Sequence, residues 1–178
     1  MEVHQGKFYL GYWHNYFHPC YLARPKKYWQ ISTHYRNLFI NSFEIMKTYV
    51  IRLKKGDEVI SEIIDFCDRH KIASGWLSGL GAASHAELAI YDLEKKEYFR
   101  KTISDTLEIA NLTGNISKLD SKTTIHCHAT LALSNFNAVA GHVDKLIVAA
   151  TCEIIIFEIE AKLERKHDQE IGLNLLEI

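Results

Sequence analysis

The stretch from Thr123 to Ile159 constrains the fold most, because its long apolar runs carry three histidines. It opens with T-T-I-H-C-H-A-T-L-A-L, passes through A-V-A-G-H-V and ends in T-C-E-I-I-I-F-E-I. Its many β-branched residues favour strands over helices. Side chains alternate between the two faces of a strand, so His126 and His128 share one face and Cys127 lies on the other. The two imidazoles are therefore expected about 6.6 Å apart along the backbone.

A third histidine, His142, follows Gly141 at about the distance of one hairpin return from His128. Three neutral imidazoles with an open fourth position are typical of catalytic zinc sites. We therefore predict that His126, His128 and His142 bind zinc or another divalent metal ion. The alternative stays open that His126 and His128 only alternate on a solvent-facing side of the strand and hold no metal. Ten histidines in 178 residues can form a His-x-His pair by chance.

Glu153, in the strand-like run that follows His142, is the candidate carboxylate partner of this site. It could accept a ring N–H from a ligating histidine, act as a fourth ligand, or lie at the rim. The sequence has no G-x-S-x-G motif, and Cys127 is expected to point away from both flanking histidines. It therefore identifies no catalytic residue, and the question of an enzymatic activity stays open.

Bulk composition restricts the classes of protein to which the chain can belong. The net charge is −1, so no global basic field favours nucleic acid. The four cysteines are scattered without a C-x-x-C motif, which is typical of reduced thiols in a cytoplasmic protein. No apolar run reaches the roughly 18 residues of a membrane-spanning helix, and the N-terminus lacks the pattern of a signal peptide.

Residues 1–45 differ from the rest of the chain, since they contain both prolines and many aromatic residues but no lasting periodicity. The basic segment Ala23–Lys27 among the aromatics would suit an arm that binds nucleic acid. The interpretation we favour is an N-terminal extension outside the fold, and Met46 could be the natural start. We therefore predict a single domain over residues 46–178.

From Met46 onward the sequence becomes regular. Val59, Ile60, Ile63, Ile64 and Cys67 form one apolar stripe, which predicts an amphipathic helix of about 13 residues that follows an N-cap at Asp57. About eight strand-like segments accompany this helix. Most of their connections are too short for parallel crossovers. The expected fold class is therefore α+β, with a mostly antiparallel β-sheet and one main helix.

Local signals also predict several details along the chain. The glycines at 75, 79 and 81 do not form a phosphate-binding loop, because a strand follows them, and they indicate a bulge or a tight strand crossing. Gly114-Asn115 predicts a turn that ends a strand. The long run 145–159 is expected to be a strand that is broken near 149–151. Residues 158–170 are expected to form a charged connector that leads to a final strand.

Several motifs follow one another along the chain from Met46 onward. They are Gly79-Leu80-Gly81-Ala82, Leu88-Ala89-Ile90-Tyr91-Asp92, Leu107-Glu108-Ile109, Leu112-Thr113-Gly114-Asn115-Ile116, His126-Cys127-His128, Gly141-His142 and Thr151-Cys152-Glu153. In their order and spacing, over about 130 residues, these motifs resemble the plant-and-prokaryote-conserved (PPC) domain family.

The resemblance implies an α+β fold, a homotrimer and a metal, with zinc expected, on the three histidines. It also implies a DNA-binding or regulatory role, because plant members carry the domain beside AT-hook motifs. This chain has no R-G-R-P core of an AT-hook, and only Glu108-Ile109 remain of the plant signature G-R-F-E-I-L. A metal-dependent enzyme, a small-molecule-binding module and a purely structural metal are the alternatives.

Overall fold

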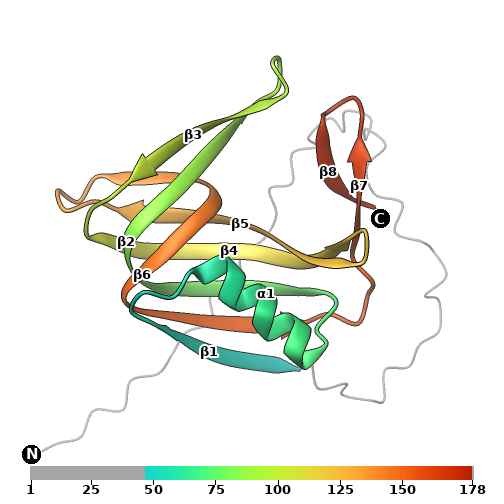
Figure 1. Cartoon of the computed structure of the whole chain (residues 1–178), viewed down its shortest axis with the longest axis horizontal. Helices are drawn as coiled ribbons and strands as arrows, with labels where there is room; N and C mark the ends of the chain where they lie inside the picture. Colours follow the sequence, from blue (N-terminus) through green and yellow to red (C-terminus); the bar gives the residue numbers. More distant parts are fainter. Residues whose placement is uncertain (1–46, 178) are drawn as a thin grey trace, which may run out of the picture. The chain divides into compact units, whose positions relative to one another are not determined.

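The computed structural model describes residues 47–177 of the chain (Figure 1). The predictions for residues 1–45, an extension or a basic aromatic arm, lie outside the described residues, as does the proposed start at Met46. Within residues 47–177, no helix is both long enough and apolar enough to cross a membrane.

Within the described residues, one helix accompanies eight strands of a single sheet. The helix is α1 (Val59–His70), and the strands are β1 (Thr48–Lys54), β2 (Gly75–Asp92), β3 (Glu97–Ile103), β4 (Leu107–Leu119), β5 (Lys122–Ala132), β6 (Ala138–Glu158), β7 (Glu164–Asp168) and β8 (Leu173–Glu177). The expected mostly antiparallel sheet with one main helix is confirmed. The sheet is nevertheless mixed, because β4 and β7 pair in parallel at Lys118 and Glu164.

Four strands of the sheet close into a ring. β2 pairs with both β4 and β6, and β5 pairs with the same two strands on the other side. β1 and β3 extend this ring by pairing with β6 and β2, respectively. The C-terminal hairpin β7–β8 joins through the parallel contact with β4. In Figure 1 this hairpin lies beside the end of β4 and β5.

α1 begins one residue later than the sequence suggested. Glu58 is the N-cap, and its carboxylate accepts hydrogen bonds from the backbone N–H groups of Ile60 and Ser61 at 3.1 and 2.8 Å. Asp57, the predicted cap, instead accepts from the Lys54 N–H at 2.7 Å and closes the preceding turn. The helix ends at His70, and its C-cap Lys71 has a positive φ of 58°, which places it in the left-handed region.

The apolar stripe of α1 faces the sheet as its periodicity predicted. Val59, Ile63 and Cys67 are fully buried and belong to one hydrophobic cluster with the inward faces of the strands. Figure 1 shows α1 lying across the sheet, and its contacts are with β5 and β6. The helix therefore packs on the strands that carry the histidines.

Several glycines within the strands mark close approaches between neighbouring strands. The pairing of β2 with β4 shifts register between Gly79 and Gly81, which confirms the predicted bulge. Gly81 has a φ of 155°, and a Cβ there would lie 2.2 Å from the Thr151 carbonyl oxygen. The predicted turn at Gly114 is wrong, because β4 runs through this residue to Leu119. A Cβ on Gly114 would lie 2.4 Å from the Cys127 Cβ, so close strand packing requires glycine.

Two further expectations for the C-terminal third are corrected. β6 runs unbroken from Ala138 to Glu158, and the predicted break at 149–151 is instead a bulge where its register with β2 shifts. Part of the predicted connector 158–170 is the strand β7. That strand pairs with β8, which confirms the final strand. Long-range pairing decided both cases. The short charged segment of β7 carries little strand signal of its own.

Candidate metal centre

Strand register brings the three predicted histidines together. His126 and His128 lie on one face of β5, and Cys127 between them is buried in the hydrophobic cluster. His142 of β6 lies directly opposite His128 in the antiparallel pair β5–β6. Directly opposite side chains on paired strands are neighbours on the same face. Backbone hydrogen bonding therefore sets the positions from which all three imidazoles project.

The three imidazoles form a nearly equilateral triangle. Their ring centroids are 5.2 Å apart for His126–His128, 5.1 Å for His126–His142 and 5.5 Å for His128–His142. One donor nitrogen from each ring lies within 4.8 Å of the other two. Among residues 47–177 this is the only group of three or more potential ligands that meets this criterion. The arrangement suits a metal ion with three nitrogen ligands.

One ring nitrogen of this histidine group lacks a partner although it is buried. Among the described residues, His142 Nδ1 has no hydrogen-bond partner, and it is inaccessible to solvent. A buried polar atom without a partner costs free energy, and each such atom in a folded protein requires an explanation. A metal ion on this lone pair would supply the missing interaction. The residues present therefore fit a three-histidine metal site.

The electrostatic environment favours the neutral form of two of the imidazoles, those of His126 and His142. Burial, followed by the Arg165 guanidinium and the other two histidines, lowers the pKa of His126 to about 4. Burial also lowers the pKa of His142, although Asp144 opposes this shift. Metals bind the neutral imidazole, so at neutral pH no proton has to leave either ring before binding.

An acidic residue lies beside His142, outside the triangle. Asp144, two residues along β6 and on the same face, places Oδ1 3.8 Å from His142 Nε2. Its Oδ2 accepts a hydrogen bond from Arg100 Nε at 2.8 Å. Carboxylates that hold the second ring nitrogen of a ligating histidine fix its orientation and raise its basicity. Asp144 therefore occupies the position in which a supporting carboxylate is expected.

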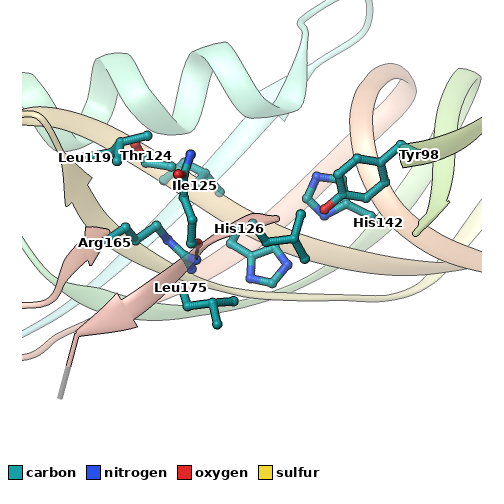
Figure 2. A pocket seen from close by; sticks show the side chains of 10 residues that line it. Tyr98, Leu119, Thr124, Ile125, His126, His142, Arg165 and Leu175 are labelled. Atoms are coloured by element: carbon teal, nitrogen blue, oxygen red, sulfur yellow. Dashed lines mark hydrogen bonds between the residues drawn. The ribbon is translucent and has the colours of Figure 1, made fainter. Parts of the chain in front are cut away.

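A pocket of about 250 Å³ opens beside His126 and His142. Figure 2 shows Tyr98 alongside His142 at one end, with a ring-centroid distance of 5.3 Å. Arg165 reaches in from β7 near the other end, and Ile125 and Leu175 lie close to it. The candidate metal centre thus borders a cavity that could hold a small molecule.

Glu153 lies apart from the histidines. It projects into a different pocket, which Val50, Leu80 and Ile155 also line, and it is not in the group of potential metal ligands. Of the remaining histidines, His85 contacts Ser104 and Glu87, and His167 contacts Asn174. The structure therefore brings together His126, His128 and His142 but leaves Glu153 on another part of the sheet.

Sequence reasoning missed Asp144 and Arg165. Asp144 carried a usable signal, since the spacing His142-x-Asp144 on a strand places both side chains on one face. Arg165 carried none, because its position depends on the parallel pairing of β4 with β7, far apart in the sequence.

The comparisons with known proteins agree with the resemblance drawn from the motifs. Residues 40–160 match the Plants and Prokaryotes Conserved (PCC) domain. No curated protein matches the chain. A PPC protein from Pyrococcus horikoshii has 27% identity and a TM-score of 0.70, with 74% of this chain and 92% of that chain covered.

Two further solved structures have similar folds. A metal-containing protein from Archaeoglobus fulgidus is 33% identical, with a TM-score of 0.72 and coverage of 77% of this chain and 97% of that chain. A proposed DNA-binding protein from Bacteroides thetaiotaomicron is 29% identical, with a TM-score of 0.71 and coverage of 73% and 91%.

Proposed function

Since the chain belongs to the Plants and Prokaryotes Conserved domain family, as its match over residues 40–160 establishes, we propose that its domain, residues 46–178, is a metal-binding module. His126, His128 and His142 hold one divalent ion, and zinc is the ion we expect. The observation that carries this proposal is the group of three imidazoles, each of which places one nitrogen within 4.8 Å of a nitrogen of the other two. The buried His142 Nδ1, which has no described partner, adds to it. The relative from Archaeoglobus fulgidus is described as metal-containing, which supports the proposal.

The chemistry of the ligand set favours zinc. Imidazole nitrogens suit zinc, copper, iron and nickel, whereas calcium and magnesium prefer oxygen ligands. Three histidines leave a fourth position open, and a bound zinc ion supplies Lewis acidity there. Asp144 and Arg100 would hold the His142 ring in place for this ion.

Zinc titration by calorimetry tests the proposal. We expect the metal-stripped protein to bind about one zinc ion per chain, and His128→Ala to lose more than about 100-fold in affinity, because losing a ligand costs more than losing an outer partner. His85→Ala is the matched control, since His85 contacts Ser104 and Glu87 rather than the triangle. Equal zinc affinities of His128→Ala and His85→Ala would refute the assignment.

We propose in addition that the protein assembles as a homotrimer, as the family resemblance implied. An exposed apolar face of the sheet supports self-association. Val50, Leu80 and Ile155 are 74%, 57% and 41% exposed and lie on neighbouring strands. Trp76 adds to the same face. Contiguous apolar surface of this kind marks protein–protein interfaces.

A DNA-binding or regulatory role is the second candidate function. It rests on relatives from Bacteroides thetaiotaomicron and Ralstonia eutropha, which are both described as proposed DNA-binding proteins. Titration of labelled duplex DNA at several salt concentrations tests it, because DNA binding weakens steeply as salt rises. Absence of salt-dependent binding would remove this candidate and leave the metal module.

The pocket beside the histidines favours the remaining alternative, a small-molecule-binding module or a metal-dependent enzyme.

We place the protein in the cytoplasm, where thiols stay reduced. The three cysteines of the described chain, Cys67, Cys127 and Cys152, are free and buried, which is compatible with this location.

A further inference from the structure

Arg165 is the only arginine among the residues that line the pocket beside His126 and His142. Figure 2 shows its side chain reaching from β7 toward the same space as His126. It lies close enough to His126 that its positive charge contributes to the lowered pKa of that imidazole. The pocket therefore joins a guanidinium to two of the three candidate metal ligands.

Neutral acceptors hold Arg165 in a fixed orientation. Its Nε donates to Ser117 Oγ at 2.9 Å, one terminal nitrogen donates to the Asn174 carbonyl oxygen at 2.7 Å, and the other donates to Asn115 Oδ1 at 2.7 Å. These bonds use three of the five N–H donors of the guanidinium. One donor on each terminal nitrogen remains for a ligand, on a side chain that these three bonds hold in place.

The positive charge of Arg165 has no anionic partner among residues 47–177. Its neighbour Glu164 pairs with Lys162 at 2.6 Å instead. Arg165 is partly buried, and burial lowers its pKa, but an arginine remains charged at neutral pH. A partly buried charge is stabilised by a counter-charge. An anion in the pocket would supply it.

The walls and size of the pocket restrict the kind of anion. Leu119, Ile125, Leu173 and Leu175 give it an apolar surface, and no lysine lines it. Its volume of about 250 Å³ lies below the range of about 300–1,000 Å³ for drug-sized ligands. A single guanidinium fork matches the two oxygens of a carboxylate. These features favour a small organic acid with an apolar body.

We propose that this pocket binds a small organic carboxylate, with the carboxylate group between Arg165 and the metal position at His126, His128 and His142 and the apolar body against the leucines. The inference rests on the proposed metal site. It goes beyond that site, because Arg165 and the hairpin β7–β8 contribute none of the three candidate metal ligands. The hairpin would instead contribute the arginine that binds the ligand.

Calorimetry with butyrate tests the proposal, with butyramide as the neutral ligand of the same shape. We expect zinc-loaded protein to bind butyrate but not butyramide. Arg165→Gln should weaken butyrate binding at least tenfold, because hydrogen bonds between charged partners are about twice as strong as neutral ones. Its zinc stoichiometry should be unchanged. Lys166→Gln, on the same strand with an exposed side chain, should bind butyrate like the unmodified chain.

A second variant covers the case in which Arg165→Gln fails to fold. Leu175→Trp fills the pocket while Arg165 stays in place, so it should block butyrate and leave zinc binding intact. Cobalt-substituted protein provides an independent readout, because an anion that reaches the metal changes the visible absorption spectrum. We expect butyrate to change this spectrum in the unmodified chain and not in Leu175→Trp.

The outcomes separate this inference from the proposed metal site. Equal binding of butyrate and butyramide, or full butyrate affinity in Arg165→Gln, would overturn the carboxylate pocket while the zinc measurements stand. A chain that binds no zinc but binds butyrate through Arg165 would overturn the metal site and retain the arginine-dependent pocket. Failure of the zinc-loaded chain to bind butyrate at millimolar concentration would also overturn the inference.

Discussion

His142 lies directly opposite His128 in the antiparallel pair of β5 and β6. This register, rather than side-chain flexibility, brings the third imidazole to the pair on β5. A shift of one residue would turn His142 to the other face of the sheet. The metal centre is thus a property of the sheet, and features that hold the register also hold the site.

Asp144→Asn should weaken zinc binding by about 10–100-fold, the range typical of partners that orient a ligating histidine. The substitution keeps the shape of the side chain but removes the charge that faces His142 Nε2 and Arg100 Nε. Zinc competition with a chromophoric chelator measures the change. Asp65→Asn on the exposed side of α1 is the matched control, and equal affinities of the two variants would contradict the role of Asp144.

Gly114→Ala should destabilise the fold by about 1–3 kcal/mol, the usual cost of overpacking a close-packed interior. The new Cβ would lie 2.4 Å from the Cys127 Cβ and from the His126 carbonyl oxygen, so β4 and β5 must move apart. Urea unfolding measures the loss, with Asn111→Ala on the exposed face of β4 as the control. Zinc affinity should fall as well, because His126 moves with its strand.

The stability of the metal-free protein should decrease on acidification between about pH 6.5 and pH 4. The pKa of His126 is about 4 in the folded chain, against a usual value of 6.5, so the unfolded chain binds more protons in this window. The contribution of neutral His126 to the free energy of unfolding is therefore fully present above pH 6.5 and is lost as the pH falls toward 4. Urea midpoints at pH 7 and pH 5 check this, and His126→Asn should show a smaller difference. Identical differences in the two proteins would contradict the assignment.

Leu80→Glu should convert the proposed trimer into smaller species, because it places a charge in the exposed apolar face beside Val50 and Ile155. Light scattering after size exclusion should give three times the chain mass of 20.5 kDa for the unmodified protein. Leu93→Glu, in the loop between β2 and β3, is the control for an added charge on an exposed leucine. A trimer that survives Leu80→Glu would exclude this face as the interface.

The local pattern of the sequence was sufficient for some elements and not for others. The stripe from Val59 to Cys67 predicted α1, because burial of one helix face depends only on a period along the chain. Strand alternation and the length of one hairpin likewise predicted that His126, His128 and His142 lie together. The Gly114 turn failed because packing against Cys127, not local turn preference, requires the glycine.

The environment of the site was less accessible to sequence reasoning. Arg165 is brought to the pocket by the parallel pairing of β4 and β7, which no periodicity encodes. Glu153 is in the same long strand as His142, but the register of β6 places it opposite Leu80, in the other pocket. Long-range strand pairing therefore decided which charged residues accompany the histidines.

A crystal structure of the zinc-loaded protein, with anomalous data collected at the zinc edge, tests the central claim most directly. The account predicts one anomalous peak per chain, bonded at about 2.0 Å by a nitrogen of each of His126, His128 and His142. His142 Nδ1, the buried atom without a described partner, should be one of the three ligands. A peak elsewhere on the chain, or no peak between these imidazoles in the zinc-loaded crystals, would contradict the account.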